Sequence, residues 1–247
     1  MVKEDYSIEK LDLSNERLNE LPVLSLYINL KKFNCSNNNL IYLDNLPSTL
    51  IELDCSGNKL TSLVNLPIGL KILNCNHNNL TSLDNLPNTL IQLDCVNNKI
   101  TNLDNLPLSL IKLYCGSNQI TSLDNLPITL EFLDCSDNEI IFLDNLPISL
   151  KTLYCHNNKI ITLDNLHNDL IKLDCACNNI SNLDNLPNTL VVLECWNNKI
   201  IHLNYLPNTI IVLYCWDNPF IYDFKPTLEN IKKYNESKLI YTLKDFK

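Results

Sequence analysis

Residues 50–69 of the chain read LIELDCSGNKLTSLVNLPIG and residues 70–89 read LKILNCNHNNLTSLDNLPNT, so one pattern returns after twenty residues. Ten cysteines keep that spacing from Cys35 to Cys215 without an insertion or a deletion. A fixed repeat of this length is typical of a solenoid, in which each coil has the same number of residues. The 247-residue chain is therefore predicted to form one elongated array rather than two compact domains.

Within each coil, one short segment has the pattern of a strand. Leu53 and Cys55 alternate with polar neighbours, which indicates a half-buried strand. One such strand per coil predicts a parallel sheet with neighbouring strands about 4.8 Å apart. The return path contains Pro67 and is too short for the helix that usually connects parallel strands. We therefore expect a concave sheet and an extended, non-helical convex side.

The repeated apolar positions are expected to form the core, and a repeated Asn is expected to satisfy the backbone between coils. The core positions of the quoted coil are Leu50, Leu53, Cys55, Leu60, Leu63 and Leu66. The Asn column runs from Asn38 to Asn218 at intervals of twenty residues. An Asn side chain has two N–H donors and one acceptor oxygen, so it can bond backbone groups of its own coil and of the adjacent coil. We expect a structural role for this column rather than a ligand site.

The two ends depart from the repeat. Residues 1–29 are expected to form an N-terminal cap and an irregular first coil that is two residues longer than the rest. Residues 30–218 are expected to hold about ten repeats, and residues 219–247 a C-terminal cap. In that cap Leu228, Ile231 and Tyr234 are spaced for one helical face, which predicts a helix from about 226 to 245 over the last strand.

Residues 118–127, NQITSLDNLP, resemble the leucine-rich repeats of effector proteins that enteric bacteria inject into host cells. They are also similar to the leucine-rich repeat proteins of giant amoeba-infecting viruses. The resemblance covers about residues 30–218 and implies a horseshoe-shaped leucine-rich-repeat solenoid of the α/β class, mostly parallel β structure. Two features differ: Asp124 stands where the bacterial repeats usually have Pro, and Cys replaces Val in the strand. Some of those effectors also carry a ubiquitin-ligase domain, for which residues 219–247 are too few.

The ladder of cysteines has three possible explanations. Zinc sites use closely spaced cysteine pairs, whereas a solenoid column presents one thiol per coil. Adjacent strands are close enough for a disulfide, but a reduced compartment and a dry core favour Cys as a small apolar filler. Cys177, outside the ladder, is the thiol expected to be reachable. The Cys-x-Asp motif of the effector ligases occurs at Cys135 and Cys215, but a buried ladder thiol cannot act as a nucleophile.

A second column, of Asp residues, lies on the return path. Its members are Asp44, Asp84, Asp104, Asp124, Asp144, Asp164 and Asp184. These carboxylates could accept backbone N–H groups in Asx turns, or they could hold calcium. We favour the turns, and we expect no metal or other cofactor. The four histidines are scattered and no catalytic motif is present, so we expect a protein that is not an enzyme.

The net charge and the hydropathy of the chain limit the classes of partner that it is expected to bind. The formal net charge of −9 argues against binding to nucleic-acid phosphates, which requires a basic surface. No apolar run is long enough to cross a membrane, and residues 1–5 lack the apolar segment of a secretory signal. We therefore expect a monomeric protein in the cytoplasm, including that of a host cell, with a protein as its partner.

The concave side chains differ along the array. In the first coils they are small and polar, whereas the later coils carry aromatic residues beside two acidic ones. The expected partner-binding residues are Tyr154, His156, Asp174, Glu194, Trp196, Tyr214 and Trp216. Trp and Tyr are enriched in binding hot spots, so we expect a protein-interaction scaffold whose partner presents basic residues. The alternatives are a substrate-recruiting adaptor for a separate enzyme, a structural role without a ligand, and, for Trp216, burial under the C-terminal cap.

Overall fold

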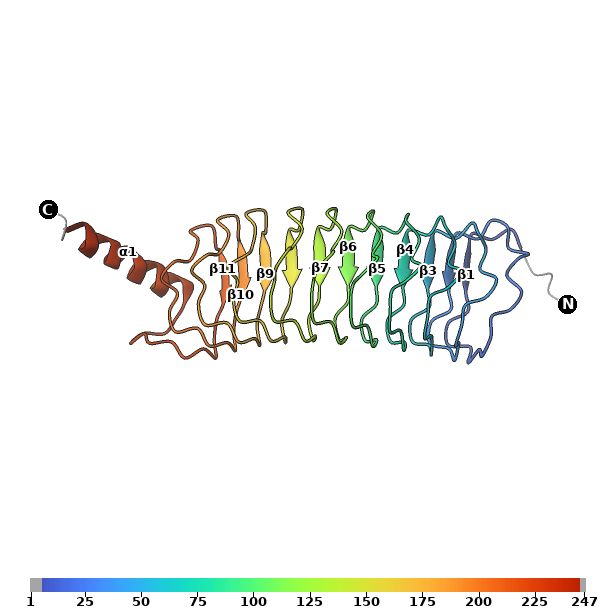
Figure 1. Cartoon of the computed structure of the whole chain (residues 1–247), viewed down its shortest axis with the longest axis horizontal. Coiled ribbons are helices and arrows are strands. Elements are labelled where there is room, and N and C mark those ends of the chain that lie inside the picture. The colour runs from blue at the N-terminus through green and yellow to red at the C-terminus, as the bar shows by residue number, and fades with distance from the viewer. Residues whose placement is uncertain (1–5, 245–247) are drawn as a thin grey trace.

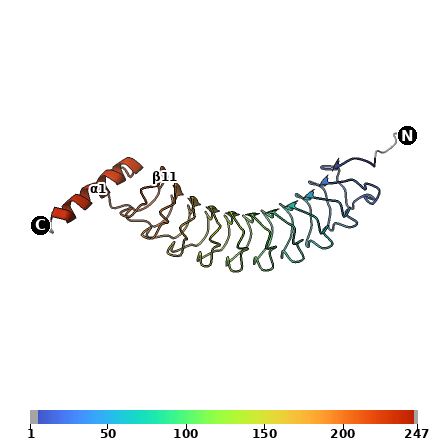
Figure 2. The ribbon, with the colours of Figure 1, turned by 90° about the horizontal axis from the view of Figure 1, so that it is seen from above.

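The computed structural model describes residues 6–244, with side chains up to residue 237. The described chain is an arc-shaped solenoid in which each coil contributes one short strand to a single parallel sheet on the inner side of the arc (Figures 1 and 2). The strands are β1 (Lys10–Asp12), β2 (Lys32–Asn34), β3 (Glu52–Asp54), β4 (Ile72–Asn74), β5 (Gln92–Asp94), β6 (Lys112–Tyr114), β7 (Phe132–Asp134), β8 (Thr152–Tyr154), β9 (Lys172–Asp174), β10 (Val192–Glu194) and β11 (Val212–Tyr214).

The strands stand in sequence order, and their register follows the repeat. Leu53 of β3 lies opposite Phe33 of β2 and Leu73 of β4, and this offset of twenty residues continues to β11. Lys10 of β1 lies opposite Lys32, an offset of twenty-two, which confirms that the first coil is two residues longer. That irregular coil also contributes a strand, so the described sheet has eleven strands rather than the ten of the regular repeats.

The core contains the repeated Leu, Ile and Cys side chains, as predicted. Leu50, Cys55 and Leu60 are fully buried. All eleven cysteines lie within the described residues, and none of them forms a disulfide there. Burial raises the pKa of the Cys35 thiol to about 12 and that of Cys215 to about 11, so neither is a reactive thiolate near neutral pH.

The Asn column joins neighbouring coils, as predicted. Asn58 is buried, and its Nδ2 donates to the carbonyl oxygens of Cys55 (3.0 Å) and of Cys35 in the preceding coil (3.1 Å). Its Oδ1 accepts the backbone N–H of Leu40 at 2.9 Å. The same bonds recur in each regular coil, so one side chain satisfies backbone groups where the chain turns away from the sheet.

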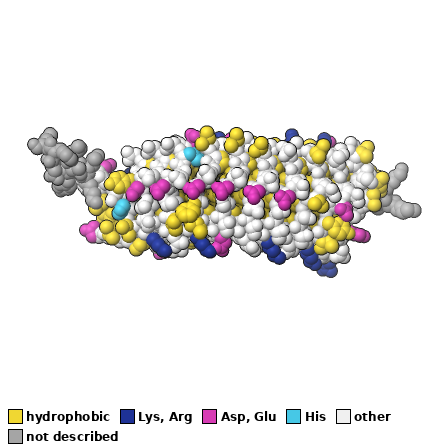
Figure 3. All heavy atoms as spheres, in the orientation of Figure 1, with side chains coloured by type: hydrophobic (Ala, Val, Ile, Leu, Met, Phe, Trp, Pro, Cys, Tyr) yellow, Lys and Arg dark blue, Asp and Glu magenta, His cyan; other side chains and the backbone are white. Residues whose placement is uncertain are grey.

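The convex return path has no helix among the described residues, as expected, but the Asp column behaves differently from the prediction. No backbone N–H of an Asx turn bonds these carboxylates among the described residues; those from Asp84 to Asp164 accept a side-chain amide from the following coil instead. Asn145 Nδ2 donates to Asp124 Oδ1 at 3.2 Å, and Asn185 Nδ2 donates to Asp164 Oδ1 at 3.0 Å. These amides partner the stacked carboxylates, which form the row of acidic side chains along the face in Figure 3. No group of three potential metal ligands occurs among the described residues.

Helix α1 (Leu228–Lys244) follows the last coil and projects beyond the end of the solenoid (Figure 1). Its first turns contact the array: Ile231 is fully buried, and Asn235 Nδ2 donates to the carbonyl of Leu203 at 2.9 Å. Tyr234 packs against Phe224, with ring centroids 5.5 Å apart. The helix therefore begins as a cap, as predicted. Residues 1–5 and 245–247 of the expected caps lie outside the described residues. No helix within the described residues is long and apolar enough to span a membrane.

Candidate partner-binding face

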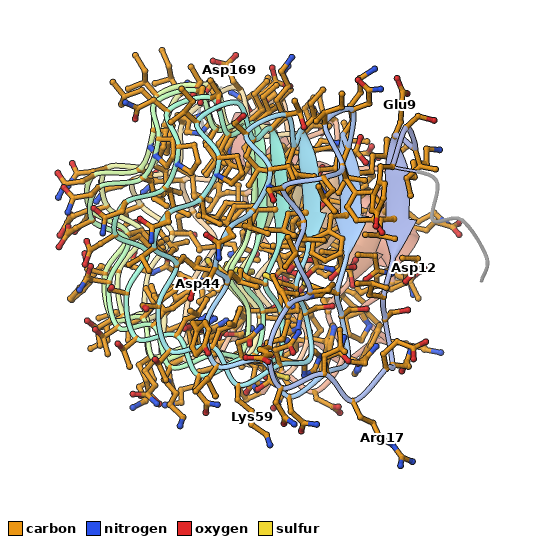
Figure 4. All side chains as sticks on the ribbon, turned by 90° about the vertical axis from the view of Figure 1, so that its right-hand side faces the viewer. Glu9, Asp12, Arg17, Asp44, Lys59 and Asp169 are labelled. Atoms are coloured by element: carbon orange, nitrogen blue, oxygen red, sulfur yellow. The ribbon has the colours of Figure 1, made fainter. Side chains whose placement is uncertain are left out.

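Three side-chain rows cover the concave face, because side chains alternate across each strand. Figure 4, a view along the solenoid, separates the faces: Asp12 lies at the sheet and Asp44 on the return path. We call the residue before the buried Leu of each strand the leading row, the residue after that Leu the central row, and the residue after the Cys the trailing row. The central row from β2 to β11 is Asn34, Asp54, Asn74, Asp94, Tyr114, Asp134, Tyr154, Asp174, Glu194 and Tyr214.

The last two coils carry an aromatic cluster of Trp196, Tyr214 and Trp216. The two indole rings stack with centroids 5.5 Å apart and planes 11° apart. Tyr214 meets Trp216 edge to face at 5.5 Å. Trp216 remains 50% exposed and Tyr214 45% exposed, so the C-terminal helix does not bury Trp216 and that alternative is wrong. The cluster is a solvent-facing apolar surface at the end of the sheet.

A second aromatic cluster lies at the middle of the sheet, and of its three rings only Tyr154 was predicted to belong to the binding face. The ring of Phe132 lies 4.7 Å from that of Tyr114 and 5.5 Å from that of Tyr154, between centroids. Lys172 Nζ lies 4.8 Å from the centre of the Tyr154 ring. Phe132 and Lys172 belong to the leading row, which the strand alternation places on the same face as the central row. The strand alternation in the sequence therefore already indicates that leading-row residues face the concave side, but the predicted binding residues came only from the central and trailing rows.

Acidic groups lie near these rings, and three carboxylates have a basic neighbour. Lys172 Nζ is 3.6 Å from Glu194 Oε1. His156 Nδ1 is 3.0 Å from Asp174 Oδ2, although the ring N–H does not point along a well-aligned hydrogen bond. Because the His156 and Asp174 side chains are this close, their interaction raises the pKa of His156, while burial of the imidazole opposes the rise. A third carboxylate, Asp137 Oδ2, is 3.9 Å from His156 Nε2.

The N-terminal half of the face is different. A hollow of about 570 Å³ lies over β1 to β5, where the exposed side chains are polar or aliphatic. Lys32 and Glu52 form an ion pair of 2.5 Å across it. Asn74 Nδ2 donates to Asp54 Oδ2 at 3.2 Å, so the carboxylates of Glu52 and Asp54 have partners within the chain. The hollow and the two aromatic clusters therefore occupy different parts of the sheet.

No protein-family model and no curated protein sequence matches the chain. Several solved structures do. YopM from Yersinia enterocolitica WA-314 is 32% identical with a TM-score of 0.72, over 85% of this chain and 56% of YopM. The functional domain of InlJ from Listeria monocytogenes, described as including a cysteine ladder, is 30% identical with a TM-score of 0.71, over 86% of this chain and 54% of that one. A Shigella effector leucine-rich-repeat domain is 31% identical with a TM-score of 0.54, over 61% of this chain and 70% of that domain.

The chain spans a little over half the length of the first two of these structures. The similarity to bacterial effectors agrees with the sequence analysis, whereas these comparisons do not show the expected similarity to proteins of giant viruses. The cysteine ladder named for InlJ matches a feature that is buried in this chain. The similar structures therefore support the solenoid fold of this chain.

Proposed function

The chain belongs to the leucine-rich-repeat proteins, and from that premise we propose that it is a non-enzymatic scaffold that binds a protein partner on its concave sheet. The observation that carries the proposal is the solvent-facing cluster of Trp196, Tyr214 and Trp216. Exposed aromatic side chains cost solubility, and they are the residues most enriched in the hot spots of protein interfaces. The similarity to a Shigella effector leucine-rich-repeat domain supports a partner in the cytoplasm of a host cell.

The charge beside the cluster supports a partner that presents basic residues. Asp174 and Glu194 belong to the central row, next to the Trp-bearing coils. Lys172 and His156 each neighbour one of these carboxylates, so a competing cation from a partner would enter a site already arranged for positive charge. The proposed binding residues are Tyr154, His156, Asp174, Glu194, Trp196, Tyr214 and Trp216.

The test begins with affinity capture of a partner from host cytoplasm, followed by measurement of its affinity for variants. Trp196→Ala is expected to weaken binding by on the order of 2 kcal/mol, about thirtyfold, because it removes one half of the indole stack. Val96→Ala, at the equivalent trailing position of an N-terminal coil, is the matched control and should leave the affinity unchanged. Both variants should keep the melting temperature of the parent chain.

Unchanged affinity for Trp196→Ala, together with loss of binding when convex Asp residues are replaced, would place the interface on the other side of the solenoid and overturn the proposal. The identity of the captured partner separates a scaffold from an adaptor. A substrate recovered together with a separate enzyme subunit would indicate the adaptor.

A further inference from the structure

The central row has a second period inside the repeat. Asp94, Asp134 and Asp174 occupy every second coil, and Tyr114 and Tyr154 occupy the coils between them. All five side chains are partly exposed on the same face. Acidic and aromatic groups therefore alternate along the axis of the solenoid at the middle of the sheet.

The three carboxylates are held in the same orientation. In each, Oδ1 accepts the backbone N–H two residues later: Asp134 from Ser136 at 3.1 Å, and Asp174 from Ala176 at 3.1 Å. Asp94 makes a longer contact of this kind, 3.4 Å, to Val96. Because one oxygen is fixed on the backbone, the carboxylates form a regular row rather than three independent rotamers.

The charges of the row are only partly compensated: Asp174 already neighbours His156 at 3.0 Å, whereas no ion pair of Asp94 or Asp134 occurs within the described residues. Burial raises the pKa of Asp94, and the carboxylates of Asp134 and Asp54 add to the rise, against hydrogen bonds from Asn76 and Val96. The fourth acid of this region, Glu194, already neighbours Lys172 at 3.6 Å. A cation placed along the row would relieve the repulsion between its members.

The spacing of the row selects the conformation of a ligand. Two coils correspond to about 9.6 Å, since neighbouring strands are about 4.8 Å apart. A polyproline II helix repeats every three residues, or about 9.3 Å, and returns its side chains to the same face at that interval. An extended strand repeats at about 6.8 Å and an α-helix returns to one face after seven residues at about 10.5 Å. The curvature in Figure 2 brings inward-pointing side chains closer than the strands, toward the polyproline II value.

We propose that the central row from Asp94 to Asp174 binds a polyproline II segment of the partner that carries Arg or Lys at every third residue. Three such cations would meet the three carboxylates, with Arg able to bond a carboxylate through two N–H groups. The intervening residues would lie on the continuous aromatic surface of Tyr114, Phe132 and Tyr154. Polyproline II segments commonly bind such aromatic surfaces because the segment loses little entropy on binding. This inference rests on the proposed function and gives the partner a conformation and a spacing.

The experiment uses three nine-residue peptides of the same composition, three Arg and six Pro, each labelled for fluorescence anisotropy against the full chain. Arg stands at every second, every third or every fourth position. The every-third peptide is expected to bind about tenfold more tightly than the other two, because only its cations share one face at the spacing of the acids. Equal affinities would overturn the inference and leave the basic-partner proposal standing. Failure of all three to bind would also overturn it, while the Trp196→Ala test with the captured partner would still decide the proposed function.

Variants within the row supply the second measurement. Asp134→Asn removes the central charge but can keep the backbone bond, since Asn74 makes the same bond to the N–H of Asn76 at 3.1 Å. It should weaken the every-third peptide about tenfold. The matched control is Asp54→Asn, in the same row but beyond the aromatic surface, where Asn74 already donates to the carboxylate. An equal effect of the two substitutions, or none from Asp134→Asn, would contradict the proposed register.

Discussion

The N-terminal and C-terminal halves of the concave sheet share one backbone and differ in their outward side chains. In both halves the strands pair in the same register and the buried Leu, Cys and Asn recur every twenty residues. Over β3 and β4 the face holds Asp54 and Asn74, which bond each other. Over β10 and β11 it holds two stacked indoles. The comparison teaches that repeated positions carry the fold, while positions that vary from coil to coil are free to carry recognition.

The largest expected effect tests whether the two halves of the sheet share the same structural scaffold. Asn78→Ala and Asn178→Ala should each lower the free energy of unfolding by about 3 kcal/mol, because buried carbonyls and one N–H lose their partner. Asn78 bonds the carbonyls of Cys55 and Cys75 at 3.1 Å, and Asn178 those of Cys155 and Cys175 at 3.0 and 3.1 Å. Urea denaturation measures both. Costs that differ by more than about 1 kcal/mol would show that the two halves are not equivalent as scaffolds.

A smaller effect is expected at the C-terminal end, where the binding face and the cap adjoin. Ile231→Ala should lower the free energy of unfolding by about 2 kcal/mol, the low end for a buried Ile, because the end of an array can relax more than its interior. Tryptophan fluorescence of the folded variant should remain unchanged, since Trp216 is 50% exposed and the helix does not cover it. A shifted emission spectrum in the folded state would mean that the C-terminal helix affects the environment of the aromatic cluster. It would contradict the expectation that the cap and the binding face are structurally independent.

The periodic part of the molecule could be predicted from the sequence because one environment is repeated in every coil. A residue such as Leu53 faces the same neighbours in each copy, so its pattern fixes both its burial and its register. The Asp column was harder, because its partners are amides that lie twenty-one residues later, as for Asn145 and Asp124. Local turn chemistry predicts bonds within one coil and gives no sign of a bond to the next.

The candidate site was only partly accessible to the same reasoning. The sequence placed Trp196 and Trp216 in adjacent coils on one face, and the structure adds their stacking at 5.5 Å. The sequence pattern did not place Phe132 in the site, because contacts between rings depend on side-chain rotamers and Phe132 lies outside the central and trailing rows. The choice between an exposed and a capped Trp216 depended on the direction of the terminal helix, which no repeat specifies.

The smallest expected effect is a pH dependence confined to the C-terminal half. Contact with Asp174 raises the pKa of His156, so their ion pair stabilises the fold fully below the ordinary value of about 6.5 and is lost as the pH rises through the raised pKa. Binding of a cationic peptide should show the opposite trend, because protonated His156 competes for Asp174. Affinity for the every-third Arg peptide is therefore expected to fall about two- to threefold between pH 8 and pH 5.5, a modest change because the imidazole is 37% exposed and screened by solvent. His156→Gln should remove this change while retaining binding, and the His156 midpoint followed by NMR should move toward 6.5 in Asp174→Asn. A pH dependence that persists in His156→Gln would assign it to another group, such as the carboxylate of Asp94, and would break the link between this histidine and the binding face.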